Sequence, residues 1–385
     1  MHRGFLRVFF PILISGISLA CGEFNGESDS MWNRISQLFR RSRTPVGLLD
    51  EDAIPEVAVE YRGEIGLELQ GAIELAFDEA TPGIGSIYRM VFTPDQSFIF
   101  SDGISKEVHE FSLEDGRYIR SFGHRGQGPG EYGSPRDVWL SPDNHVYAYD
   151  ASSGRILFYD RQGTYLNNIK MDAKAMQGTR DNDLLLVVSH LPDKIIFFQK
   201  INSKNGQIKY SVGLSARKYD LTVHNQSSLP YHSTLNRAYY VGATEYMVKE
   251  IDLVTGKIIR RFGWKPPEFI PLAEKYYTEF NSFDELAEAI SSSSILARMV
   301  LLAERYLIVG YYNPQGYEES VIIYDITATD IIPAYPLDDA AAELVIRKSR
   351  ALATYQDCLY LYKPPSAEKG ETSNGRLERY ALSLP

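Results

Sequence analysis

The residues best able to do chemistry lie in a glycine-rich segment at 123–131, GHRGQGPGE. It places Arg125, Gln127 and Glu131 among glycines, and Arg136 follows a few residues later. Together these polar side chains could hydrogen-bond a carboxylate or a sugar hydroxyl. The segment lacks the Gly-Lys-Ser/Thr sequence and the following helix of a phosphate-binding loop. Two interpretations stay open: a ligand-binding loop, or a loop whose glycines only let the chain cross from an outer strand to the next inner one. The structural interpretation is favoured for the glycines.

The other residues that could bind a metal ion do not form a recognisable metal-site pattern. Asp102 and Asp150 lie at equivalent strand ends, and this repetition favours a hydrogen bond that stabilises a turn over metal binding. The histidines show neither H-x-H nor HExxH spacing, and no Cys-His pattern is present, so we predict neither a metal nor a cofactor. No G-x-S-x-G motif follows the N-terminal segment, so no nucleophile is predicted.

The N-terminal segment predicts export. Residues 1–7 include Arg3 and Arg7, and residues 8–20 are apolar but too few to span a bilayer, which takes about 20 residues. We therefore predict a signal peptide over 1–20. The sequence SLAC at 18–21 resembles the lipobox of bacterial lipoproteins, which implies lipidation of Cys21 and an anchor at the cell envelope. Ordinary cleavage near Ala20 is the alternative.

Residues 21–60 are predicted to be a lipid-anchored tether, and 61–385 a folded domain. Within the tether, MWNRISQLFRR at 31–41 has apolar residues at helical spacing beside arginines. Such a helix would lie on the membrane surface or dock on the domain.

Composition limits the partners. The formal net charge is −10, and loss of Arg3 and Arg7 with the signal peptide makes it −12. This argues against a nucleic-acid surface, which needs concentrated Lys and Arg. With Cys21 assigned to the lipid, Cys358 is a single thiol, and we expect it in the core. We also expect the protein to be monomeric. The 26 tyrosines suit strands as well as surfaces that contact peptide or glycan.

Self-similarity is the strongest signal for the fold. The segments that start at Thr93 and Ser141 share a Pro-Asp turn, strands and a glycine turn at an offset of 48 or 47 residues. Turn glycines recur at 116, 163, 206 and 256. A period of about 40–50 residues with short antiparallel strands predicts a β-propeller with one four-stranded blade per repeat.

We predict six blades, at 87–123, 135–170, 183–213, 236–263, 295–332 and 350–385. Residues 68–77 are expected to supply the last strand of the sixth blade and so close the ring, because open sheet edges invite aggregation. Residues 264–294 interrupt the period and include a short helix near 282–294, with Ser282 as its N-cap. The aromatic residues of this insert either rim a ligand groove or pack a small cap, and packing is favoured; they are Trp264, Phe269, Tyr276, Tyr277, Phe280 and Phe283.

The segment from the glycine-rich loop through the second blade resembles an NHL repeat. The resemblance rests on Gly126, Gly128, Pro129, Gly130, Tyr132, Pro135, Pro142, Asp143, Asp150, Arg155, Ile156, Phe158, Asp160 and Gly163. The sequence GQGPGEY at 126–132 is similar to the corresponding segment of six-bladed propeller lipoproteins of Bacteroidetes-type bacteria. This resemblance implies an all-β, six-bladed propeller of NHL/TolB-like type. The resemblance says little about activity, because proteins of one fold have many different functions.

The expected function is a non-catalytic, envelope-anchored propeller that binds or scaffolds a protein, peptide or glycan through Arg125, Gln127, Glu131 and Arg136. The alternative is a propeller enzyme, a lyase or hydrolase, with its site in the central channel. Three or more His, Asp or Glu side chains converging on the channel would favour the enzyme.

Overall fold

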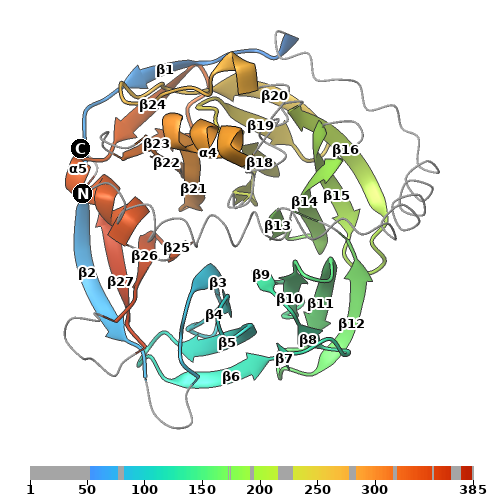
Figure 1. Cartoon of the computed structure of the whole chain (residues 1–385). Helices are drawn as coiled ribbons and strands as arrows, with labels where there is room; N and C mark the ends of the chain where they lie inside the picture. Colours follow the sequence, from blue (N-terminus) through green and yellow to red (C-terminus); the bar gives the residue numbers. More distant parts are fainter. Residues whose placement is uncertain are drawn as a thin grey trace.

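The computed structural model describes residues 53–76, 82–171, 173, 175–190, 195–215, 229–276, 283–314, 319–348, 351–365 and 374–383. These residues form six sheets arranged as blades around a central axis (Figure 1). The predicted all-β, six-bladed propeller is therefore confirmed. The signal peptide, Cys21, the tether as far as residue 52, Ser282, Tyr277 and Phe280 lie outside the described residues, as does the side chain of Phe283.

Four antiparallel strands form the body of each blade, and in blades 1–4 they follow the chain from the axis outward (Figure 1). Blade 1 contains β3 (Ile87–Phe92), β4 (Ser97–Asp102), β5 (Glu107–Ser112) and β6 (Tyr118–Phe122). Blade 2 contains β9 (Pro135–Leu140), β10 (Val146–Asp150), β11 (Arg155–Tyr159) and β12 (Tyr165–Lys170). Blade 3 contains β13 (Ala175–Gly178), β14 (Asp183–His190), β15 (Ile195–Asn202) and β16 (Ile208–Ser215). Blade 4 contains β17 (Tyr231–His232), β18 (Arg237–Tyr240), β19 (Val248–Asp252) and β20 (Lys257–Phe262).

Blades 5 and 6 each include a strand from the N-terminal part of the chain. Blade 5 contains β21 (Ile295–Leu302), β22 (Tyr306–Tyr312), β23 (Ser320–Asp325) and β24 (Ile331–Pro336), with β1 (Ala58–Tyr61) added parallel to β24 at its outer edge. Blade 6 contains β25 (Ala351–Tyr355), β26 (Cys358–Lys363) and β27 (Arg376–Leu382), and its outer strand is β2 (Leu67–Glu74), antiparallel to β27. The ring closure expected from residues 68–77 is confirmed for the strand itself. Sheet structure begins at Ala58, inside the segment predicted as tether.

The turn glycines explain the spacing of the repeat. Gly116 and Gly163 have φ angles of 70° and 92°, a left-handed region that favours glycine. A Cβ atom at Gly116 would overlap the carbonyl oxygen of Glu74 on β2, and one at Gly163 would lie 3.1 Å from the carbonyl oxygen of Ser121 on β6. Each of these glycines therefore lets the turn between the third and fourth strands of a blade lie close against the backbone of the outer strand of the preceding blade.

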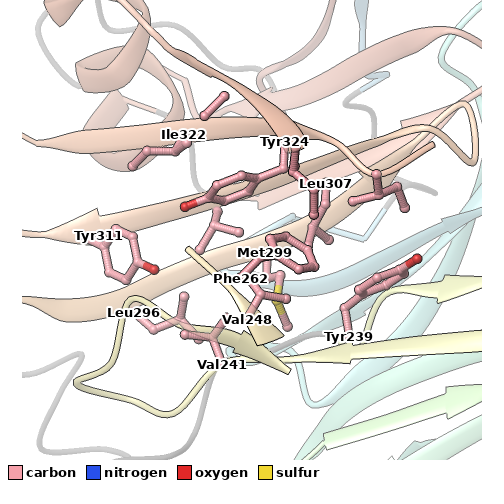
Figure 2. Close-up of a cluster of buried hydrophobic side chains, with 14 of the residues drawn as sticks. Tyr239, Val241, Val248, Phe262, Leu296, Met299, Leu307, Tyr311, Ile322 and Tyr324 are labelled. Carbon is pink, nitrogen blue, oxygen red and sulfur yellow. The ribbon is translucent and has the colours of Figure 1, made fainter. Parts of the chain in front are cut away.

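The core lies between neighbouring blades. Figure 2 shows the cluster that joins blades 4 and 5, where Phe262 packs edge-on to Tyr324 with ring centroids 5.4 Å apart. The other labelled members are Tyr239, Val241, Val248, Leu296, Met299, Leu307, Tyr311 and Ile322. Cys358, which we expected inside the core, is partly buried at the edge of the cluster between blades 6 and 1.

The insert between blades 4 and 5 forms a small cap. Its helix α4 (Phe283–Ser292) confirms the prediction, and Ala289 of α4 packs with Leu272 and Tyr276. Phe269 is buried in the cluster between blades 4 and 5, with Trp264 partly buried against it. The described aromatic residues therefore pack as predicted. Short helical turns also lie at η2 (Glu274–Tyr276), α5 (Asp339–Glu343) and η3 (Leu344–Lys348). Among the described residues, no helix is long and apolar enough to cross a membrane.

Candidate functional site: a basic patch on the loop face

The two faces of the ring differ in the connections they carry. One face holds the turns between the second and third strands of each blade and the connections between blades, and we call it the loop face. The opposite face holds the turns after the first and third strands, and we call it the turn face. The glycine-rich segment connects blades 1 and 2 on the loop face, where β7 (His124–Arg125) and β8 (Glu131–Tyr132) form a short parallel pair.

Glu131 organises the glycine-rich loop. Its Oε2 accepts a hydrogen bond from the backbone N–H of Gly128 at 2.7 Å, and His124 Nε2 lies 3.1 Å from Oε1. The Gly128 N–H is the main cause that lowers the pKa of this carboxyl. A Cβ atom at Gly126 would overlap the Glu131 carboxylate. The structural role predicted for the glycines is thus confirmed, and the Glu131 oxygens are engaged within the loop.

Arg125 and Arg136 both lie near a third cation, Lys106, and repel its charge. The pKa of Lys106, in the turn between β4 and β5, is lowered first by burial and then by repulsion from Arg136 and Arg125. Gln127 is exposed in the same loop. Lys106 was not predicted from the sequence, although its position after Asp102 places it in a turn of the same face.

An aromatic ring borders this cluster of cations. The guanidinium carbon of Arg136 lies 5.3 Å from the centroid of Tyr88, within cation–π range. A Cβ atom at Gly103 would overlap the Tyr88 ring, which therefore lies directly over that glycine. Ser101 Oγ donates to the backbone oxygen of Arg136 at 3.2 Å and joins blades 1 and 2 at this point. We call Tyr88, Lys106, Arg125 and Arg136 the basic patch.

Asp102 and Asp150 position this face. Asp102 accepts hydrogen bonds from the backbone N–H groups of Gly85 at 2.6 Å and Ile104 at 2.7 Å, so it ties its own turn to the segment before β3. Asp150 accepts in the same way from Ser134 N at 2.7 Å, and from Ser153 Oγ at 2.6 Å. The predicted turn-stabilising role is confirmed for both carboxylates. In the part of the chain that the structure describes, no group of three or more His, Cys, Asp or Glu side chains could hold a metal ion.

His109 lies near the patch but adds no charge to it. The ring is fully buried, with Ser105 Oγ 3.1 Å from Nε2 and Ser121 Oγ 2.8 Å from Nδ1. Burial lowers its pKa to about 4, against a weaker opposing effect of Asp102. The imidazole is therefore neutral near pH 7 and acts as a structural link between β5 and β6.

Polar side chains on the innermost strands connect blades 1, 2 and 3 next to the patch. Arg89 of β3 donates from Nη2 to Gln177 Oε1 of β13 at 2.8 Å, and its Nε lies 3.6 Å from Asp137 Oδ1 of β9. Asp137 Oδ2 also accepts from Met176 N at 2.9 Å. Burial raises the pKa of Asp137 despite the opposing charge of Arg89. These groups are engaged with one another, which fits a role in holding three blades together.

Comparison with known proteins supports the fold. Residues 79–241 match a family model described as a 6-bladed beta-propeller. A Bacteroides fragilis protein described as exported is similar in structure, with a TM-score of 0.58 and 14% identity over 85% of this chain and 100% of that chain. A member of the duf4221 family from Bacteroides vulgatus has a TM-score of 0.56 and 11% identity over 83% of this chain and 98% of that chain.

Structures that are less similar to this chain do not indicate its activity. A virginiamycin B lyase from Staphylococcus aureus has a TM-score of 0.44 and 11% identity over 84% of this chain and 100% of that chain. Among curated proteins, none matches the sequence. The comparisons therefore establish the propeller, and the function has to be inferred from this chain's own residues.

Proposed function

We propose that this protein is a non-catalytic binding propeller of the cell envelope, which recognises a carboxylate-bearing protein, peptide or glycan through the basic patch on its loop face. The observation that supports this proposal is the gathering of Lys106, Arg125 and Arg136 in a chain of net charge −10. Like charges held together repel one another, and an anionic ligand would relieve that repulsion. Glu131 holds the loop, Gln127 adds a polar group, and Tyr88 supplies an apolar surface beside the cations.

The scaffold suits such a role. Asp102 and Asp150 fix the turns that carry the patch, and arginine can hold a carboxylate through two parallel hydrogen bonds. Side chains on loops that a rigid frame positions commonly carry recognition.

Replacing the three cations by glutamine should abolish binding of an acidic peptide. We expect K106Q/R125Q/R136Q to bind fluorescein-labelled hexaglutamate at least about tenfold more weakly than the native protein. Added salt should weaken the native complex, because the contacts are charged. The thermal midpoint should fall only modestly, because Arg125 is exposed and the half-buried Lys106 and Arg136 are replaced by a polar side chain. Fluorescence anisotropy and a thermal melt measure the two effects.

The matched control removes the same charge elsewhere. R117Q/K204Q/K257Q alters exposed residues of the turns after the third strands, on the turn face. It should keep most of the affinity. Equal losses in the two triple variants, or native binding that hexaglutamine matches, would contradict the proposed site.

The envelope placement includes a lipid anchor at Cys21. The SLAC sequence supports this proposal, and the exported Bacteroides fragilis protein of similar fold is consistent with it. We expect C21S to stop lipidation and release the protein in soluble form, because two acyl chains provide most of the membrane affinity. Metabolic labelling with a palmitate analogue and membrane fractionation measure this. Unchanged labelling or membrane retention of the variant would rule out the anchor.

A further inference from the structure

A pocket of about 240 Å³ opens on the turn face between blades 6 and 1, away from the basic patch. It lies where β2 closes the ring, and the register of β2 against β27 shifts by a bulge between Leu69 and Gly71. The third and fourth strands of blades 1–4 also shift register by a bulge, so this irregularity is part of the repeat. The lining residues are Gly71, Ala72, Ile73, Gln96, Leu113, Tyr355, Gln356, Tyr360 and Arg379.

The lining combines a cation, two carboxamides and two phenol rings. Tyr355 is partly buried and stacks on Phe92, with ring centroids 4.9 Å apart. Tyr360 packs against the same Phe92 ring at 4.6 Å, so the aromatic wall is held firmly. Pockets for small molecules typically have such apolar walls with a few polar groups that set orientation. The volume is below the range of about 300–1,000 Å³ for drug-sized ligands, which points to a ligand of one ring.

The two glutamines lie in an unfavourable backbone conformation. Gln96 and Gln356, each in the turn after the first strand of its blade, have φ angles of 60° and 51°. The corresponding turns of blades 2, 3 and 4 use Asn144, Asn182 and Asn236, and that of blade 5 uses Ala303 and Glu304, all with φ between 50° and 64°. Asparagine tolerates this left-handed region better than glutamine. The left-handed position therefore belongs to this turn in every blade, and in blades 1 and 6 it is occupied by two glutamines that line the same pocket.

Arg379 brings a positive charge that no described carboxylate neutralises at ion-pair distance. Its neighbour on the same strand, Arg376, pairs with Glu378 at 2.6 Å. Arg379 is exposed, and it lies opposite Gly71 on β2 and Tyr360 on β26. A guanidinium in this position can hold a ligand carboxylate through two hydrogen bonds.

We propose that this pocket binds a single sugar ring that carries a carboxylate, of the uronic-acid type. Arg379 holds the carboxylate, Gln96 and Gln356 hydrogen-bond the ring hydroxyls, and the partly exposed Tyr355 contacts the apolar face of the ring. Tyr360 is only 3% exposed, and its phenol bonds Arg379, so it supports the guanidinium from below the pocket surface. The site is separate from the basic patch and does not depend on it.

The test uses the whole folded protein with sodium D-glucuronate, D-glucose and acetate as probes, measured by ligand-observed NMR and calorimetry. We expect glucuronate to bind at least about tenfold more tightly than glucose or acetate, because only glucuronate has both the carboxylate and the ring. R379Q should remove that preference, and R117Q, an exposed arginine of the same face, should keep it. No detectable binding of glucuronate up to about 10 mM, or acetate binding as tightly as glucuronate, would overturn the proposal.

A second variant separates binding from folding. Q96N/Q356N shortens both side chains and places a more tolerant residue at each left-handed position. Its thermal midpoint should be equal to or above that of the native protein, while glucuronate affinity falls at least about tenfold. Unchanged affinity would assign the glutamines to the turns alone and overturn their role. The variant K106Q/R125Q/R136Q should bind glucuronate normally; if it loses glucuronate while R379Q does not, the sugar belongs to the basic patch.

Discussion

Deletion of residues 61–78 should leave a protein without a single cooperative unfolding transition and with a strong tendency to aggregate. These residues include β2, which pairs with β27 from Leu67 opposite Leu382 to Glu74 opposite Arg376. Their loss would expose the unpaired backbone of β27, and such an edge recruits other chains. Asn374 adds to the closure, because its side chain bonds Ile84 N at 2.8 Å and the backbone oxygen of Ala76 at 2.6 Å.

Circular dichroism during heating and size-exclusion chromatography measure this prediction. The control deletes residues 22–50, which precede all described strands, and it should unfold cooperatively as a monomer. A stable, monomeric 79–385 fragment would show that the ring does not need β2.

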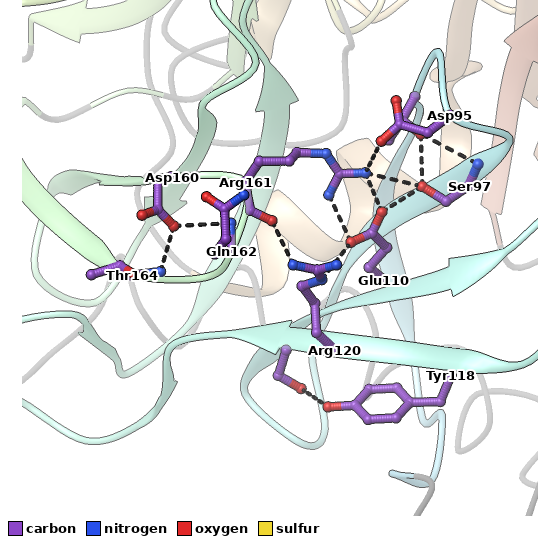
Figure 3. A network of polar contacts seen from close by, with 11 residues as sticks. Asp95, Ser97, Glu110, Tyr118, Arg120, Asp160, Arg161, Gln162 and Thr164 are labelled. Carbon is purple, nitrogen blue, oxygen red and sulfur yellow. Dashed lines mark hydrogen bonds and ion pairs between the residues drawn. The ribbon is translucent and has the colours of Figure 1, made fainter.

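Replacement of Arg161 by leucine should destabilise the protein by about 2 kcal/mol, because it removes one of the two guanidinium groups that pair with the buried Glu110 carboxylate and leaves Arg120 Nε at 3.2 Å. Arg161, in the third turn of blade 2, reaches across to blade 1, where its Nη1 donates to Glu110 Oε2 at 2.6 Å and its Nη2 contacts Oε1 (Figure 3). Glu110 is only 1% exposed. Arg120 completes the link, since its Nη1 donates to the backbone oxygen of Arg161 at 2.8 Å.

The same replacement made in an E110Q background tests the cause. A neutral amide costs far less than a charge to leave without its ion-pair partner, so R161L should then destabilise by about 1 kcal/mol or less. Denaturant unfolding of the four proteins gives the coupling between the two positions. R117Q, which removes an arginine paired at the surface with Asp115, should change stability by less than about 0.5 kcal/mol. Equal costs of R161L in both backgrounds would show that packing, rather than the ion pair, accounts for the loss.

Most of the blade structure could be predicted from the sequence, and the exceptions are short elements. The innermost strands β13 and β17 have four and two residues, too few for an alternating pattern, so blades 3 and 4 were predicted to begin one strand late. Blade 5 was predicted to end at 332, whereas its outer strand β24 runs to Pro336 and has a proline at each of two positions, which weakens its strand pattern. The strand β1 was also missed, because its place beside β24 depends on a parallel contact with a segment far along the chain. The helix α5 has five residues and gave no periodic signal.

The basic patch likewise contains residues that the sequence predicted and one that it did not. Arg125 and Arg136 were predicted from one segment of sequence, whereas Lys106 belongs to a neighbouring turn and was recognised only through its contacts. Glu131 was predicted to face a ligand, and its carboxylate instead holds the loop through Gly128 and His124. Its part in ligand binding stays a prediction.

The sequence by itself determined the repeat, the six blades, the glycines at the third turns and the carboxylates of Asp102 and Asp150. These features are local, since each depends on hairpins and turns whose residue preferences lie within about 50 residues of chain. Only the tertiary structure decided which side chains meet between blades: the three cations of the basic patch, the Arg161–Glu110 link, and the pocket lined by Gln96, Gln356 and Arg379. Those contacts depend on how the blades pack and where the ring closes. Packing joins residues of neighbouring blades, at the pocket hundreds of positions apart, without any local pattern to mark them.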